Sequence, residues 1–220
     1  MNRVVITGIG AVTAFGKTWP EIQAAMLRYE NAVRYMPEWR EVTDLNAKLG
    51  APVDGYHPPA HWTRKQLRSL GPVSQMCVEA GERALEDAGL LDDPAICDGR
   101  MGVASGSSTG SPRDICDLAQ LIMYGHSEGF SANTYIRMMP HTTAANLAIF
   151  FGLKGRLIPT SSACTSGSQA IGYAYEAIRY GQIPMMLAGG GEELCHSEVC
   201  VFALCRQPEK RCAEDHARPL

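Results

Sequence analysis

LIPTSSACTSGSQA, residues 157–170, is the stretch that decides the fold. An apolar, β-branched run is followed by small hydroxyl residues, a single cysteine and then a helical pattern. The helix is indicated by apolar residues spaced three and four apart, at Ala170, Ile171, Ala174 and Ile178. The sequence therefore predicts a strand that turns sharply into a helix, with Cys164 in the turn.

Cys164 is the candidate nucleophile of the chain. Its small neighbours leave room for a substrate to reach the sulfur. A helix start presents unpaired backbone N–H groups and the positive end of the helix dipole, and both favour the reactive thiolate. The alternative is a buried, inert thiol, which is how most free cysteines behave.

Three motifs in register resemble those of one enzyme family. Residues 161–172, SSACTSGSQAIG, are similar to the nucleophile signature of the β-ketoacyl-acyl carrier protein synthases, condensing enzymes of the thiolase superfamily. Residues 151–155 (FGLKG) and 186–192 (MLAGGGE) flank it at matching distances. The resemblance runs from Val4 to about Val201 and implies a thiolase-like, layered α/β/α/β/α fold, of which this chain carries the first half.

The resemblance also implies a reaction, a decarboxylative Claisen condensation. Cys164 would hold an acyl thioester, and malonyl-acyl carrier protein would lose CO2 with the help of two histidines that the family carries in its second half. The product would be a 3-oxoacyl carrier protein of fatty acid or aryl-polyene and polyketide biosynthesis. Residues 138–143 and 191–195 look most like the ketosynthases of bacterial aryl-polyene gene clusters. No metal, nucleotide or other cofactor is expected.

Four further site residues are implied by the same family. Basic residues at the positions of Lys65 and Arg68 help to dock the acidic acyl carrier protein, although a simple solvated face is the alternative interpretation. The small residues Ser107 and Ser108 would lie near the acyl pocket and leave it roomy or polar. Residues 156–163 would pair with a second copy or a related subunit, giving a homodimer or heterodimer.

Composition limits the other function classes. The chain has 220 residues, 45% of them hydrophobic and 20% charged, which is ordinary for a globular protein. A net charge of −3 argues against a nucleic-acid or membrane-surface role. No apolar run approaches the roughly 18 residues of a membrane span, and the N-terminus enters a strand pattern directly rather than a signal peptide. We therefore expect a cytoplasmic protein.

The eight cysteines form no Cys-x-x-Cys pair, so free thiols are expected in place of disulfides. A zinc site near the C-terminus is disfavoured because the cysteine spacings of five and seven do not match ligand pairs. The residues concerned are Cys195, His196, Cys200, Cys205 and Cys212.

Two glycine motifs near the N-terminus are incomplete. Gly8 and Gly10 begin a dinucleotide fingerprint, but Thr13 occupies the third glycine position. Residues 16–18 resemble the end of a Walker A loop, which would need a glycine where Ala11 stands. Nucleotide binding is therefore not expected.

Alternating strand and helix patterns predict an α/β fold with a mostly parallel sheet and helices on both faces. His141 is interpreted as a helix-start residue and not as a catalytic partner of Cys164. Residues 31–62 suit a surface excursion. The expected strands are 4–7, 101–104 and one that starts at 157, and the expected helices are 20–29, 73–88, 113–124, one ending near 151 and one from 170.

Residues 1–201 are expected to form the N-terminal half of a condensing enzyme, and residues 202–220 an aberrant tail. Plausible codons for residues 206–211, read in another frame, spell the family-like ASRKNA, so a frameshift near Cys205 is one hypothesis and a deliberately shortened chain another. Three functional alternatives remain: a thiolase or hydroxymethylglutaryl-type enzyme, a non-catalytic chain-length partner, and an inactive fragment. Cys164 argues against the chain-length partner, which usually lacks this cysteine.

Overall fold

The computed structural model describes residues 1–43, 45 and 47–206. The chain divides into two compact units. The first unit contains Met1–Asn31 and Val53–Glu193, and the second contains Ala32–Pro52 together with the chain from Leu194. All the predicted site residues belong to the first unit.

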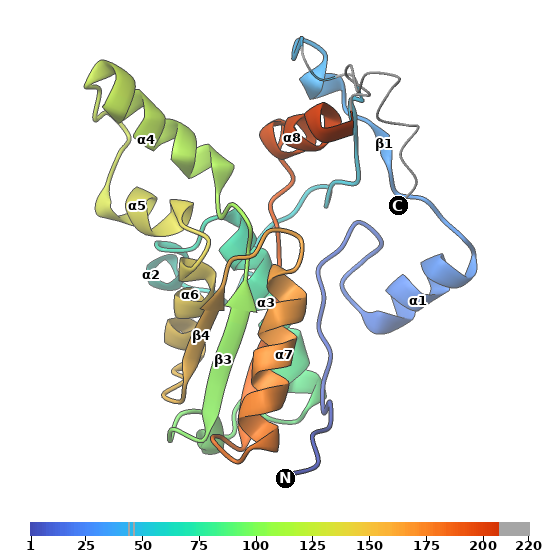
Figure 1. Cartoon of the computed structure of the whole chain (residues 1–220), viewed down its shortest axis with the longest axis vertical. Coiled ribbons are helices and arrows are strands. Elements are labelled where there is room, and N and C mark those ends of the chain that lie inside the picture. The colour runs from blue at the N-terminus through green and yellow to red at the C-terminus, as the bar shows by residue number, and fades with distance from the viewer. Residues whose placement is uncertain (44, 46, 207–220) are drawn as a thin grey trace, which may run out of the picture. The chain divides into compact units, whose positions relative to one another are not determined.

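A three-stranded parallel sheet forms the centre of the first unit (Figure 1). Its strand order is β4-β3-β5. Gly106 at the end of the central strand aligns with Thr160 on one side and with Gly190 on the other, so the carboxyl ends of all three strands share one edge. The strands are β3 (Met101–Gly106), β4 (Leu157–Thr160) and β5 (Met185–Gly190).

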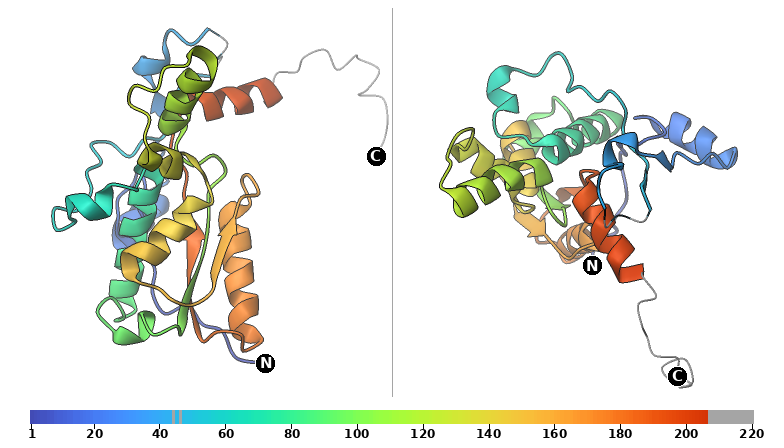
Figure 2. Two further views of the ribbon diagram at one scale, coloured as in Figure 1. Left: turned by 90° about the vertical axis from the view of Figure 1, so that its left-hand side faces the viewer. Right: turned by 90° about the horizontal axis from the view of Figure 1, so that it is seen from above.

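Helices cover both faces of this sheet, as predicted (Figures 1 and 2). On one face lies α7 (Ser166–Arg179), whose buried alanines form a small cluster with Ala104 of β3. On the other face lie α3 (Pro72–Asp87) and α6 (Thr142–Phe151), which contribute Val78, Leu85 and Leu147 to the larger apolar core. The small side chains on α7 allow this helix to approach the strands closely.

Capping residues mark the ends of several helices of the first unit. Thr18 and Glu21 form a capping box at the start of α1, and Gly125 adopts a left-handed φ of +69° after α4. Gly89, which follows the end of α3, has a φ of +68°. The elements are α1 (Trp19–Leu27), α2 (Arg64–Leu67), the 3₁₀ turn η2 (Pro94–Ile96), α4 (Pro112–Tyr124) and α5 (Ala132–Met138).

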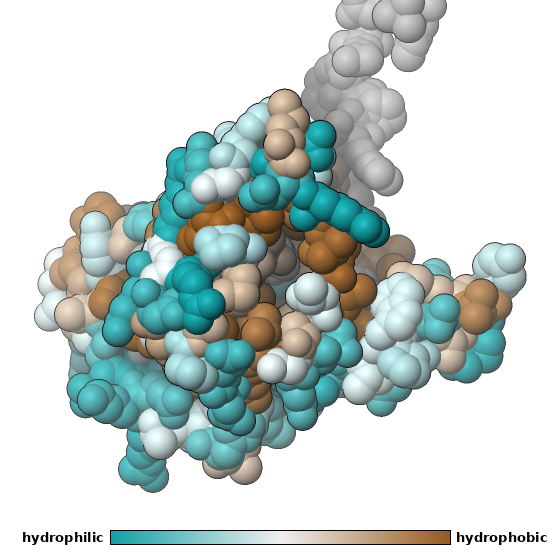
Figure 3. Space-filling model, turned by 90° about the horizontal axis from the view of Figure 1, so that it is seen from below, coloured by the Kyte–Doolittle hydropathy of each residue, from teal (hydrophilic) through white to brown (hydrophobic). Residues whose placement is uncertain are grey.

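The prediction of a buried strand at residues 4–7 is wrong. Residues 1–12 form no strand, and the side chains of Val5 and Ile6 are 58% and 83% exposed. The segment is instead held beside α3, where the backbone N–H of Ile9 donates to Asp87 at 2.9 Å. Apolar side chains therefore remain on the surface, and the face in Figure 3 shows such areas in brown among polar ones.

The second unit is small. It contains the antiparallel pair β1 (Arg34–Tyr35) and β2 (Leu49–Gly50), the 3₁₀ turn η1 (Pro37–Trp39) and α8 (His196–Arg206). Residues 31–62, predicted as a surface excursion, contribute a buried cluster of Met36, Trp39 and Leu45 that packs against α8. The tail hypothesis concerns mainly residues 207–220, which lie outside the described residues, and it remains a prediction.

Candidate active site

Cys164 lies where the sequence predicted, in the turn between β4 and α7. Its side chain is exposed, so the buried alternative does not apply. Ala163, the residue before it, has a φ of +51°, which is uncommon for a residue other than glycine. Such strained backbone is held in place only by surrounding contacts, and it is often found at functional sites.

Hydroxyl groups fix this turn from within. The hydroxyl of Ser166, the first residue of α7, donates to the carbonyl of Ala163 at 2.7 Å and accepts the N–H of Ser162 at 2.9 Å. The hydroxyl of Thr165 donates to the carbonyl of Ser162 at 2.7 Å. These bonds hold the turn, so the thiol of Cys164 lies at the start of α7, where the positive end of the helix dipole is.

The neighbouring loop, Ser107–Thr109, follows β3 at the same edge of the sheet, and it is held by Glu192. Side-chain hydroxyls of Ser107 (2.8 Å), Ser108 and Thr109 (3.1 Å) donate to this carboxylate. The backbone N–H groups of Ser108 (2.7 Å) and Thr109 (3.4 Å) donate to it as well. Ser107 is buried and Ser108 half-buried. The predicted pair is therefore in place near the strand ends, with its hydroxyls committed to Glu192.

Glycine packing brings the three strand ends together. A side chain at Gly106 would collide with the Thr160 hydroxyl and with Ser166. A Cβ at Gly190 would come within 2.9 Å of the Cα of Gly167, three residues after the cysteine. The turn with Cys164, the Ser107–Thr109 loop and the end of β5 consequently share one site, which we call the strand-end site.

Lys65 and Arg68 lie elsewhere, on α2 and at its C-cap, and both side chains are exposed. Thr63 begins this four-residue helix with a capping box to Gln66. Within the described residues, no carboxylate is paired with Arg64, Lys65 or Arg68, so three cations face solvent on one short element.

Another thiol, Cys77, lies on α3 close to the end of β5. A Cβ at Gly191 would lie 2.6 Å from its sulfur. Burial of the sulfur, reinforced by the negative charge of Glu192, raises the pKa of Cys77 to about 12. The six cysteines from Cys77 to Cys200 are all free thiols. His141 stands at the N-cap of α6 with its side chain exposed and makes no side-chain cap bond.

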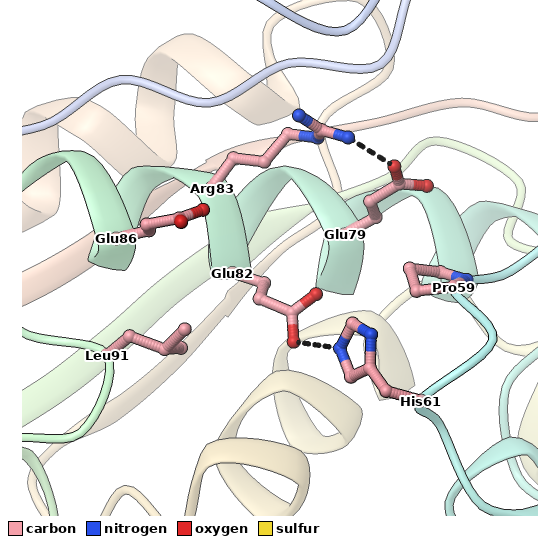
Figure 4. A pocket seen from close by; sticks show the side chains of 7 residues that line it. All are labelled: Pro59, His61, Glu79, Glu82, Arg83, Glu86 and Leu91. Carbon is pink, nitrogen blue, oxygen red and sulfur yellow. Dashed lines mark hydrogen bonds and ion pairs between the residues drawn. The ribbon is translucent and has the colours of Figure 1, made fainter.

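A hollow of about 270 Å³ lies along α3, and none of the predicted site residues lines it (Figure 4). Three of its charged side chains, Glu79, Glu82 and Arg83, form ion pairs. Glu79 binds Lys17 at 2.8 Å and Arg83 at 3.0 Å, and Glu82 binds His61 at 2.8 Å. Burial raises the pKa of Glu79, but hydrogen bonds from Lys17 and Arg83 lower it by more, so the pKa lies below its usual value. The lining residues are Pro59, His61, Glu79, Glu82, Arg83, Glu86 and Leu91.

The described residues contain neither a metal-binding cluster nor a membrane-spanning helix. No three His, Cys, Asp or Glu side chains there are arranged to hold a metal ion. None of the helices in that part of the chain is both long and apolar enough to cross a bilayer.

Known proteins match both the sequence and the fold. The family model "Beta-ketoacyl synthase, N-terminal domain" matches residues 1–208. The 3-oxoacyl-[acyl-carrier-protein] synthase 1 of Buchnera aphidicola is 30% identical over 203 residues, which are 92% of this chain and 50% of that protein. The crystal structure of a beta-ketoacyl synthase from Burkholderia phymatum matches with a TM-score of 0.91 and 51% identity, over 100% of this chain and 54% of that one.

A more distant structure shows the same fold. It is AntDE:AntF, a type II polyketide synthase acyl-carrier protein in complex with its ketosynthase, with a TM-score of 0.74 and 23% identity over 92% of this chain and 54% of that one. The fold and the strand-end site thus define a thiolase-like α/β protein. The chain belongs to the beta-ketoacyl synthase family, matches its N-terminal domain, and spans about half the length of the curated relatives it matches.

Proposed function

We propose that Cys164 accepts an acyl group from an acyl carrier protein, as the first step of a condensation that makes a 3-oxoacyl carrier protein. The observation that carries this proposal is the exposed thiol in the strained turn between β4 and α7. Family membership supports it, because the matched relatives are named 3-oxoacyl-[acyl-carrier-protein] synthases.

The acyl transfer follows from the position of this thiol. The Cys164 thiolate attacks the thioester carbonyl carbon, and the oxygen becomes an oxyanion. The backbone N–H of Cys164, at the positive end of α7, is proposed as one donor to this oxyanion. The C–S bond to the carrier then breaks, the carrier's thiolate leaves and takes up a proton, and the acyl group remains on Sγ.

In the second step, malonyl carrier protein loses CO2, and the carbanion attacks the acyl carbonyl. The C–S bond to Cys164 breaks, and the product is two carbons longer. The resemblance places the histidines for this step beyond the stretch that the chain covers. The chain's own part in the proposed reaction is therefore acyl loading.

The carrier and the acyl chain are assigned to separate surfaces. The exposed cations Lys65 and Arg68 are proposed to dock the acidic carrier protein, with strong dependence on salt. The Ser107–Thr109 loop, fixed by Glu192, is proposed to line the acyl path next to Cys164. Its small residues suit a roomy or polar path.

A second subunit is proposed to pair along β4, over residues 156–163. Among the described residues this strand has a neighbour on one side only, and its Leu157 is 42% exposed. Proline in a strand is tolerated mainly at sheet edges, and Pro159 fits that position. Sedimentation of the wild type beside a Leu157→Lys variant tests the pairing, because a charge on this edge would turn a dimer into a monomer.

The acyl-loading proposal is tested by incubating the chain with an acyl carrier thioester, or with the epoxide cerulenin, and mapping adducts by mass spectrometry. We expect a single adduct at Cys164. Cys116 on α4 is the matched control, because it is also an exposed free thiol but does not precede a helix at the strand-end site.

The Cys164→Ala variant should lose the adduct, and Cys116→Ala should keep it. A folded wild type that forms no adduct at Cys164, or labels both cysteines at equal rates, contradicts the nucleophile role.

A further inference from the structure

The segment that follows α2 is held by side chains from three helices. The carbonyl of Arg68 accepts a hydrogen bond from Nη1 of Arg137 on α5, at 3.3 Å. The next two carbonyls along the chain accept from Asn146 on α6 (3.1 Å) and from Gln75 on α3 (2.9 Å). The backbone carbonyls of three successive residues, 68–70, thus accept hydrogen bonds from side chains of α5, α6 and α3.

Arg137 is itself fixed on its other side. Its Nε and Nη2 bind Oδ1 of Asp114 on α4 at 2.8 and 2.6 Å, and Nη2 also reaches the Thr134 hydroxyl at 3.4 Å. The Asp114 side chain is only 6% exposed. The planar guanidinium therefore bridges a buried carboxylate and the end of α2, a geometry that the single ammonium group of lysine cannot reproduce.

A helix of four residues cannot keep its direction by its own hydrogen bonds, because even isolated helices of a dozen residues are marginal in water. Its direction must come from its flanks. Before α2, Trp62 is buried in the core; after it, the carbonyl clamp holds the chain. The cations Lys65 and Arg68 are carried between these two anchors.

We propose that Arg137 is a positioning residue that, together with Asp114, fixes the direction in which α2 presents Lys65 and Arg68 to the acyl carrier protein. This inference rests on the carrier docking of the proposed function. It assigns to Arg137 an indirect role, through the backbone of Arg68, and no contact with the carrier.

The test is a double-mutant cycle on binding of purified, fluorescently labelled holo-acyl carrier protein to the full chain. Arg137→Gln should weaken binding by roughly five- to tenfold, within the range of coupled polar contacts. In the Lys65→Gln/Arg68→Gln background it should cause no further loss, because the cations that it positions are gone. Arg137→Lys should not restore binding, although it keeps the charge.

Arg100→Gln is the matched control. It removes the same charge and breaks an exposed ion pair, to Asp98 at 2.7 Å, just before the first residue of β3. This variant should bind the carrier as the wild type does. Because Arg137→Gln alone leaves Asp114 buried and unpaired, the neutral pair Asp114→Asn/Arg137→Gln is a second variant in which the fold is expected to survive. Thermal melting and the alkylation rate of Cys164 check that each variant is folded.

The outcomes separate the two proposals. If Lys65→Gln/Arg68→Gln binds the carrier like the wild type, the docking surface is wrong and this inference falls with it. If those cations matter but the folded Arg137 variants bind like Arg100→Gln, the positioning role alone is overturned. It is also overturned if Arg137→Gln weakens binding equally in both backgrounds, or if Arg137→Lys restores it, because either result indicates direct contact with the carrier.

Discussion

Cys77 and Cys164 are both free thiols of the first unit, yet they lie in opposite environments. Cys77 lies within α3, where the backbone N–H groups already serve the helix, and it lies close to a carboxylate. Cys164 stands just before α7, exposed and at the positive end of the helix dipole. The difference teaches that burial and nearby charge, together with the place of a thiol along a helix, set how readily it forms the reactive thiolate.

The largest expected effect is on alkylation. With a pKa of about 12, Cys77 is thiolate in roughly one molecule in ten thousand at pH 8. Because the thiolate is the reacting form, iodoacetamide should label Cys164 at least about a hundredfold faster than Cys77. Peptide mapping by mass spectrometry over time measures both rates.

Unfolding is the control for this prediction. In guanidinium chloride the two cysteines should react at similar rates, because the environment that separates them is lost. Equal rates in the folded protein would remove the contrast.

A smaller effect is expected from Gly190→Ala. The new methyl group would lie 2.7 Å from the carbonyl oxygen of Gly106 and 2.9 Å from the Cα of Gly167, so backbone must move. We expect a loss of about 1–3 kcal/mol in the free energy of unfolding and an altered alkylation rate at Cys164, because α7 starts at this contact. Urea unfolding and the alkylation assay measure these changes.

Gly172→Ala is the matched control for Gly190→Ala. It lies within α7, and a Cβ there meets nothing within 4 Å. It should stabilise the protein by about 0.5–1 kcal/mol, since alanine favours a helix interior, and leave the rate at Cys164 unchanged. If both variants destabilise alike, the close packing of the strand ends is not what holds the turn.

The turn at Cys164 was predictable because its signals are local. A β-branched run, small residues and a helical spacing follow one another within residues 157–178. Residues 4–7 carry a similar apolar run, yet no strand forms there, because a strand also needs hydrogen bonds to a neighbouring strand, and residues 4–7 pair with none of the described strands. Leu157 finds one opposite Val103, whereas the N-terminal run lies along α3, where Gly8 and Gly10 pack against the helix backbone.

The role of Glu192 was missed for a similar reason. Its partners are 83 to 85 residues away in sequence, so no local pattern connects them. One signal was available: strands of a parallel sheet end at one edge, so a serine-rich loop after β3 and a carboxylate after β5 are expected to be neighbours. Likewise, the Arg137 clamp joins α2 to α5 through a backbone carbonyl, which a sequence pattern does not reveal.

The smallest expected effect sharpens the contrast between the two cysteines, and it comes from Glu192→Gln. The negative charge of Glu192 disfavours a thiolate at Cys77, so its removal should lower the pKa of Cys77. Burial is the larger cause of the raised pKa and remains in the variant, so the pKa stays well above that of an ordinary thiol. Alkylation of Cys77 at pH 10 should therefore rise by less than about tenfold, while the rate at Cys164 is unchanged.

Glu176→Gln, which removes an exposed carboxylate on α7, is the control and should alter neither rate. An unchanged rate at Cys77 in Glu192→Gln would mean that burial alone separates the two thiols. A rise at Cys164 as well would mean that release of the Ser107–Thr109 loop from the carboxylate also changes the surroundings of the turn. The contrast between the cysteines would then depend on the fit of the strand-end loops as well as on helix position.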